Sequence, residues 1–196
     1  MKRAGRDRRA LLVAMTPPAP FIVDIGSDHG HVAHAVGAYA TERRPHRTGR
    51  LDLNWIIADG LRPFRDVDVA IVAGMGALTI IGILADSPPP RVAVLHCPDD
   101  PPRLRRWLAG NGWRIEAEGL AREAGRFAEV VRARPGTEPH TGLELEFGPR
   151  LPQDPLWPEH VRQLLGHWTN LAEATAGKAP EKHADAMARV QWLSRW

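Results

Sequence analysis

The sequence has little that would suit an exported or membrane-anchored protein. Its 196 residues include one cysteine, Cys97, which cannot form a disulfide within the chain and so fits a reducing compartment. No apolar run reaches the length of a membrane span. The stretch Leu11 to Met15, which follows the charged N-terminus, is too short for the core of a secretory signal. We therefore expect a cytoplasmic protein.

Patterns for metal binding and nucleophilic catalysis are also missing. His29, His31 and His34 are close in sequence, but no set of cysteines or carboxylates completes a metal site around them. We find no Ser-His-Asp constellation. Cys97 could be a nucleophile, but a small packed residue at the end of a buried strand is the simpler interpretation. We expect no metal.

Basic residues are clustered although the net charge is modest. The formal charge is +3 and the isoelectric point is about 9.6. The clusters lie within residues 1–9, 43–50 and 103–106. Such clusters suit a polyanion such as RNA, while solvated surface faces would explain them equally well. The residues that we expect to contact RNA are Arg3, Arg6, Arg8, Arg9, Arg43, Arg44 and Arg47.

Short apolar runs alternate with helical segments along the first two thirds of the chain. Strands are predicted at 21–26, 37–41, 55–58, 67–72 and 91–96, and helices at 77–85 and 102–109. This alternation predicts a parallel sheet with crossover helices. Two more strands, at 113–120 and 126–134, leave no room for a helix between them and predict an antiparallel hairpin at one edge. The expected fold class is α/β, mostly parallel with an antiparallel last strand.

Three parts are expected along the chain. A Rossmann-like domain covers residues 1–135 and begins with a helix from Arg8 to Met15. Residues 136–158 are rich in Gly, Pro, Thr and Glu and predict a linker. Apolar residues at helical spacing then predict an amphipathic helix at 159–177, and a second helix begins at Pro180. The C-terminal part, 159–196, is therefore a helical hairpin.

The strongest local motif follows the first strand and reads Asp24-Ile25-Gly26-Ser27-Asp28-His29-Gly30. In this fold a nucleotide-like cofactor lies across the carboxyl ends of the strands. Glycines permit close approach of the backbone, and the acids can accept hydrogen bonds from a cationic ligand. A pyrophosphate would instead prefer G-x-G-x-x-G. The motif therefore favours S-adenosylmethionine, with Asp24, Gly26, Ser27, Asp28 and Gly30 at the cofactor.

Three later turns complete the candidate site. Glu42 follows the second strand and can hold ribose hydroxyls, although it could equally pair with a neighbouring arginine. Asp59-Gly60 follows the third strand and can bond an adenine amino group. Gly74-Met75-Gly76 follows the fourth strand and would line the acceptor side, where glycines let the backbone approach a flat substrate. For each of these segments, the alternative is an ordinary turn that ends a strand and binds no ligand.

Together these turns resemble the TrmK family, bacterial enzymes that methylate N1 of an adenine in the D-arm of tRNA. Segments 103–115, 123–131 and 147–149 resemble the family's later elements, so the resemblance covers nearly the whole chain. It implies a class I methyltransferase fold, S-adenosylmethionine as cofactor and tRNA as partner. It also implies that Gly74, Met75 and Gly76 serve catalysis by positioning the reactants, without an obligatory general base.

The sequence departs from the family around the cofactor. The helix after the glycine loop has barely two turns, and only 17 positions separate Glu42 from Asp59, where the family has a full helix. His96-Cys97-Pro98 replaces a Gln-Pro-Asn run. Two alternatives therefore stay open: a methyltransferase-like RNA- or protein-binding module without catalysis, and a methyltransferase that acts on another acceptor.

Overall fold

The computed structural model describes residues 7–44, 52–123 and 125–196. Arg3, Arg6 and Arg47, which the sequence predicts to contact RNA, lie outside these ranges. The chain forms two compact units, Met1–Arg150 and Leu151–Trp196. This division falls inside the segment 136–158 that the sequence predicts to be a linker. The boundaries 1–135 and 159–196 stay a prediction.

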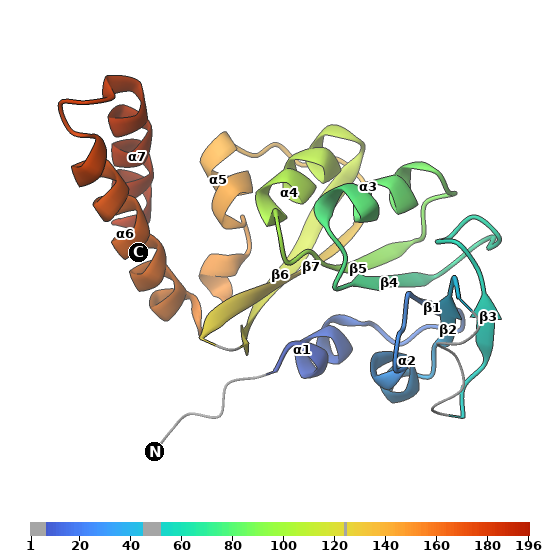
Figure 1. Ribbon diagram of the computed structural model, residues 1–196. Helices are drawn as coiled ribbons and strands as arrows, with labels where there is room; N and C mark the ends of the chain where they lie inside the picture. Colours follow the sequence, from blue (N-terminus) through green and yellow to red (C-terminus); the bar gives the residue numbers. More distant parts are fainter. Residues whose placement is uncertain (1–6, 45–51, 124) are drawn as a thin grey trace, which may run out of the picture. The chain divides into compact units, whose positions relative to one another are not determined.

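A seven-stranded sheet forms the first unit, in the order β3-β2-β1-β4-β5-β7-β6 (Figure 1). The first five strands in sequence run parallel, and β7 is antiparallel to both of its neighbours, β5 and β6. The predicted fold class is therefore confirmed. The strands are β1 (Ile22–Ile25), β2 (Tyr39–Glu42), β3 (Trp55–Ile57), β4 (Val69–Ala73), β5 (Val92–His96), β6 (Trp113–Glu123) and β7 (Arg126–Pro135).

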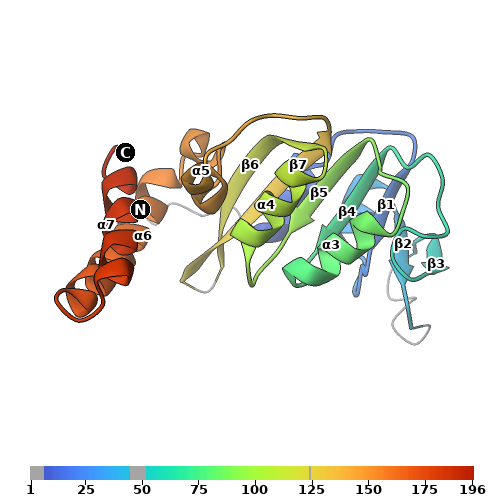
Figure 2. The ribbon, with the colours of Figure 1, turned by 90° about the horizontal axis from the view of Figure 1, so that it is seen from above.

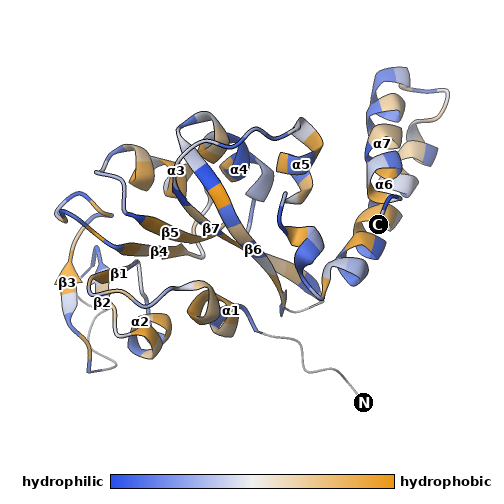
Figure 3. Cartoon of the chain, turned by 180° about the vertical axis from the view of Figure 1, so that it is seen from behind, coloured by the Kyte–Doolittle hydropathy of each residue, from blue (hydrophilic) through white to orange (hydrophobic). Residues whose placement is uncertain are grey.

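Helices cover both faces of the sheet. Helices α1 (Arg8–Met15) and α2 (His31–Val36) lie on one face. On the other face lie α3 (Ala77–Ala85), α4 (Pro101–Gly110) and α5 (Gly142–Phe147), the layer that Figure 2 views from above. The central strands are therefore buried on both sides, which explains why they are continuous apolar runs rather than alternating ones. Figure 3 shows this apolar character in β4 and β5.

Alternate residues of the central strands supply two separate cores. Val72 of β4 and Leu95 of β5 pack in the core that α3 and α4 cover. Ile71 and Val94, their neighbours in sequence, pack with Leu11 of α1 in the opposite core. All five side chains are fully buried. Because successive side chains of a strand point to opposite faces, one short apolar run serves both layers.

Local signals fix several helix starts. The side chain of Asp7 accepts a hydrogen bond from the Ala10 amide at 3.0 Å, so α1 begins at the predicted residue. Thr141 and Glu144 form a capping box that begins α5 inside the stretch predicted as a linker. A 3-10 turn at Leu151–Gln153 follows it. The composition of 136–158 concealed these elements.

The crossovers near the cofactor side are short, as the sequence predicts. Helix α2 has 6 residues and lies between Gly30 and Gly37, which both have left-handed backbone with φ of 72° and 67°. Within the described parts of the segments from β2 to β3 and from β3 to β4, the chain forms no helix.

A buried ion network around Arg105 lies inside the first unit. The side chain of Arg105 is fully buried, and its Nε donates to Glu118 at 2.6 Å while its Nη2 donates to Glu129. Its Nη1 donates to the carbonyl of Glu146 at 3.2 Å, and Glu118 also accepts from the Arg150 amide at 2.8 Å. The network joins α4, β6, β7 and α5. Arg105 thus has a structural role, and the suggestion that the whole 103–106 cluster faces a polyanion is wrong for this residue.

The second unit is a helical hairpin of α6 (Trp157–Thr175) and α7 (Pro180–Leu193). The ring of Trp157 meets the rings of Trp192 and Trp196 edge to face, at centroid distances of 6.5 and 6.2 Å. Arg189 stacks over Trp168 at 4.6 Å. In the parts of the chain that the structure describes, no helix combines the length and the apolarity of a membrane span.

Candidate active site

A cleft of about 890 Å³ lies at the carboxyl ends of β1, β2, β3 and β4. Four strand-ending turns and α1 supply its walls. Most of the predicted cofactor and acceptor residues line it, namely Asp24, Gly26, Ser27, Asp28, Glu42, Asp59, Gly60, Gly74 and Met75. Parallel strands bring their carboxyl ends to one edge of a sheet, so turns that are far apart in sequence meet in one place.

The glycine loop after β1 is held against β2 by hydrogen bonds. The Ser27 amide donates to the carbonyl of Thr41 at 3.0 Å, and the Asp28 amide donates to Oε1 of Glu42 at 3.1 Å. Gly26 and Asp28 have positive φ angles of 67° and 51°. A Cβ atom on Gly26 would lie 2.3 Å from Cε of Met75, so the loops after β1 and β4 touch at this point.

Asp24 is the most perturbed acid of the cleft. Its residue is 5% exposed, and burial raises the pKa of its carboxyl to about 6. Hydrogen bonds from Ser27 and from the Ala33 amide partly oppose that rise, whereas the nearby charge of Glu42 adds to it. A cationic group placed in the cleft would favour the ionised form of Asp24. The pocket is therefore suited to a positively charged ligand.

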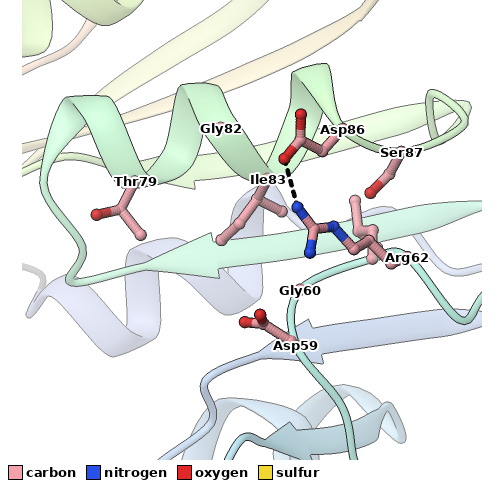
Figure 4. A pocket seen from close by; sticks show the side chains of 9 residues that line it. Asp59, Gly60, Arg62, Thr79, Gly82, Ile83, Asp86 and Ser87 are labelled. Atoms are coloured by element: carbon pink, nitrogen blue, oxygen red, sulfur yellow. Dashed lines mark hydrogen bonds and ion pairs between the residues drawn. The ribbon is translucent and has the colours of Figure 1, made fainter.

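Asp59 and Gly60 lie where the main cleft joins a smaller cavity of about 180 Å³ (Figure 4). The two hollows share Asp59, Gly60, Thr79 and Ile83. The side chain of Ile83 packs against Gly60, where a Cβ atom would be 3.3 Å from Cγ1 of Ile83. An ion pair of 2.6 Å between Arg62 and Asp86 borders the smaller cavity. Apolar Ile83 and the carboxylate of Asp59 thus lie at the junction of the two hollows.

The turn after β4 leads into α3 and is hydrogen-bonded to the end of β5. The Gly74 amide donates to the carbonyl and to Nδ1 of His96, at 3.0 and 3.2 Å. Gly76 is the N-cap of α3 and faces Asp99, with 2.7 Å between a built Cβ and Oδ2. Gly30 does not line the cleft either, and a Cβ atom built on it would meet the side chains of Leu53 and Trp55. Gly76 and Gly30 thus shape the cleft without lining it.

His96 and Asp99 were missed by the sequence analysis as site residues. His96 is 2% exposed, and burial together with the charge of Arg8 lowers the pKa of its imidazole to about 4, against a smaller opposing effect of Glu129. Oδ1 of Asp99 accepts from the Ala77 amide and from the thiol of Cys97, both at 2.9 Å. The pair Asp99-Asp100 before the Pro-rich start of α4 was the available signal, although Asp100 caps that helix and Asp99 contacts the start of α3. His96 and Asp99 hold the β4 turn in place.

Arginines border the cleft on two sides. Arg8 and Arg9 of α1 and Arg43 after β2 line it, and Arg44 is exposed beside them. Nη1 of Arg8 lies 4.0 Å from a Cβ built on Gly74, and its Nη2 lies 3.3 Å from Glu123. Positive charge therefore borders the cleft, while the acids Asp24 and Glu42 are buried inside it.

The three histidines that prompted a metal interpretation do not form a site in the structure. Within residues 7–44, 52–123 and 125–196, no group of three histidine, cysteine or acidic side chains is placed to hold a metal ion. His29 instead lies 3.5 Å from the carboxylate of Asp28, and its ring is 6.0 Å from that of His31.

Comparison with known proteins agrees with this geometry. A Mycoplasma pneumoniae protein provisionally named a tRNA methyltransferase is 30% identical over 169 residues, 72% of this chain and 77% of its own length. The structure of M. capricolum TrmK with S-adenosylhomocysteine has a TM-score of 0.76 at 18% identity and covers 96% of this chain and 95% of that one. B. subtilis TrmK, an m1A22 tRNA methyltransferase, has a TM-score of 0.70 at 20% identity, with 96% of each chain covered. At such identities the structures show the shared fold.

The family assignment comes from the sequence model of one family. Residues 46–191 match the model described as TrmK, tRNA (adenine(22)-N(1))-methyltransferase. The match spans the turns after β3 and β4, the terminal hairpin of the sheet and most of the helical unit. The resemblance predicted from the sequence is thereby confirmed, and the chain belongs to the TrmK family of tRNA (adenine(22)-N(1))-methyltransferases.

Proposed function

We propose that this protein transfers the methyl group of S-adenosylmethionine to N1 of an adenine in tRNA, in the position that the family description gives as adenine 22. The observation that carries the proposal is the cleft of about 890 Å³, lined by acids and glycines from four strand ends. Its size lies in the range of about 300–1,000 Å³ that is typical of cofactor sites. Since tRNA is the substrate, we expect the protein to act in the cytoplasm.

The donor set fits a cationic nucleoside. Asp24 is buried, and burial raises the pKa of its carboxyl, so its ionised form is disfavoured. An ammonium group in the cleft would compensate the negative charge of that form. Glu42 would accept from ribose hydroxyls, and Asp59 would accept from an adenine amino group near Gly60 and Ile83. Bound S-adenosylmethionine supplies a methyl group on a positively charged sulfur.

The reaction needs positioning more than proton transfer. Adenine N1 carries a free electron pair that forms the new bond to the methyl carbon while the carbon–sulfur bond breaks and its electrons stay on sulfur. The positive charge passes from sulfur to the adenine ring, so no proton has to leave. The Gly74 turn, fixed through His96 and Asp99, would hold the flat base in line. Because His96 is neutral at physiological pH, it adds no repulsive charge there.

A methylation assay tests the proposal. The full-length protein is incubated with tRNA and labelled S-adenosylmethionine, and the RNA is digested to nucleosides. Label in N1-methyladenosine is the expected result, and label in any other nucleoside contradicts the substrate assignment. Absence of cofactor binding at millimolar concentration in a calorimetric titration contradicts the enzyme itself and favours a binding module.

Asp28→Asn and Asp66→Asn form a matched pair for the cofactor site. Both aspartates are exposed and have positive φ, 51° and 52°, which asparagine tolerates equally well. Only Asp28 lines the cleft. We expect Asp28→Asn to weaken binding of S-adenosylmethionine and Asp66→Asn to leave it unchanged. Equal affinities of the two variants would remove Asp28 from the site.

A further inference from the structure

The β6–β7 hairpin extends past the rest of the sheet on the side of the cleft. The last residue of β5, His96, pairs with Val130 of β7, which in turn pairs with Gly119 of β6. Beyond this level the hairpin continues through the pairs Leu120–Glu129, Ala121–Ala128, Arg122–Phe127 and Glu123–Arg126. At about 3.3 Å per residue, these four pairs project about 13 Å beyond the edge. Since β6 runs parallel to β5, the projection lies at the carboxyl edge, where the cleft is.

The projecting part presents arginine. Arg126 is exposed at the end of the hairpin, and the guanidinium of Arg122 lies over the ring of Phe127 at 5.9 Å. The two acids of the projection are engaged by other arginines. Glu129 accepts from buried Arg105, and Glu123 pairs with Arg8.

Arg8 connects the hairpin to the cleft. It pairs with Glu123 at 3.3 Å and also lies beside Gly74, on the acceptor side of the site. Arg9, its neighbour on α1, is exposed and lines the same cleft. Ala121 and Ala128 pack with α1, so Glu123 and Arg126, two residues further along each strand, lie on the same face of the hairpin as α1, whereas Arg122 lies on the opposite face. Arg8, Arg9 and Arg126 are therefore on one side of the hairpin, and we term these three residues the basic rim. The acids among them are Asp7 and Glu123.

We propose that the basic rim docks the phosphate backbone of RNA next to the nucleotide that enters the cleft, an inference that rests on the proposed function. Guanidinium groups match phosphate oxygens in charge and geometry. Phosphate contacts fix the register of a nucleic acid without reading its sequence, and that is what an enzyme needs in order to place one base over Gly74. The first four strands of the sheet end at the cleft itself, whereas the hairpin extends past it and can support the flanking chain.

Substitution of Arg126 tests the rim, with Arg91 as the matched control. Arg91 precedes β5 at the opposite edge of the same sheet, and its side chain is 76% exposed. Binding of tRNA by Arg126→Ala, Arg126→Glu and Arg91→Glu is measured by fluorescence anisotropy across a salt series, and cofactor binding by calorimetry. We expect Arg126→Ala to reduce the slope of log K against log salt by about 0.7–0.9, the value of one lost phosphate contact. Arg126→Glu should lower tRNA affinity about tenfold or more, with cofactor affinity unchanged.

Each outcome bears on the proposal. If Arg126→Glu binds tRNA as tightly as Arg91→Glu, or if it loses tRNA and cofactor together, the rim is not a docking surface. If the unmodified protein binds tRNA through Arg126 but methylates no RNA, the docking inference stands and the proposed function fails. If methylation proceeds and the salt slope of Arg126→Ala equals that of the unmodified protein, the proposed function stands and the docking inference fails.

Discussion

Asp24 is expected to lower the stability of the protein at neutral pH. Burial raises its pKa from 3.8 to about 6 in the folded state. The folded protein therefore binds this proton more tightly than the unfolded chain. The resulting stability is fully present below pH 4 and is lost as the pH rises through 6. A shift of about 2 pKa units corresponds to roughly 3 kcal/mol, which the ionised protein lacks at pH 8.

Asp24→Asn should remove this pH dependence. Asparagine has the same shape and does not ionise, so the variant avoids the cost of a buried charge. Unfolding by urea, followed without cofactor at pH 5 and pH 8, gives the free energy of unfolding of both proteins. We expect the stability of the variant relative to the unmodified protein to rise by roughly 1–2 kcal/mol between these pH values. The rise is only part of the full effect, because pH 5 already lies above 3.8, where Asp24 of the unfolded chain ionises. A difference that stays constant or shrinks would refute the reasoning.

The same substitution should impair cofactor binding. In the proposed site, the ionised carboxylate of Asp24 compensates a cationic ligand, and asparagine cannot. Calorimetry should therefore show weaker binding of S-adenosylmethionine by Asp24→Asn at pH 8, and a fall in the affinity of the unmodified protein as the pH drops below 6. A variant that is more stable and binds equally well would place the cation elsewhere in the cleft.

Three further substitutions or probes test the structure independently. Arg105→Met leaves the buried carboxylates of the ion network without their cation, so the free energy of unfolding should fall by about 3–5 kcal/mol in urea; a loss below about 1 kcal/mol would argue against the network. Gly26 and Gly37 both have a left-handed φ of 67°, so alanine strains the backbone equally at either position. Only at Gly26 would the added Cβ also collide with Met75, since Gly37 has no neighbour within 4 Å, so only Gly26→Ala should abolish cofactor binding in a titration. Burial and the hydrogen bond to Asp99 raise the pKa of the Cys97 thiol to about 11, so iodoacetamide at pH 8 should label the folded protein far more slowly than the urea-unfolded one.

Most of the sheet could be predicted from local pattern. The central strands were found because both of their faces are buried, which makes each a short apolar run between turns. The helix predicted at Arg8–Met15 has these bounds in the structure. The prolines after it indicate its end, and the structure adds that Asp7 caps its start. The first hairpin strand was predicted to end at residue 120 and not at Glu123, since its last residues carry charge and extend beyond the sheet. That extension depends on pairing between β6 and β7, and periodicity does not report it.

Residues whose roles depend on distant partners could not be predicted. Arg105 belongs to a run of arginines that looks like a charged surface, and only the packing of α4 separates it from the exposed Arg103 and Arg106. His96 ends β5 and Asp99 lies three residues further on, but the groups that they hold belong to the turn after β4 and the start of α3. Which strand ends contact each other depends on the order of the strands in the sheet. Local sequence patterns do not give that order.

The structure also bears on whether the shortened cofactor side can still support a site. A missing helix would matter if it left the glycine loop without backing. Instead, Leu53 and Trp55 pack behind Gly30, where a Cβ atom would lie 2.5 Å from Cδ1 of Leu53 and 3.2 Å from Cζ2 of Trp55. The loop is held from the front by Glu42, which accepts from the Asp28 amide. Two apolar side chains and one carboxylate thus fix the loop between them, so the glycine loop is held although α2 has only 6 residues.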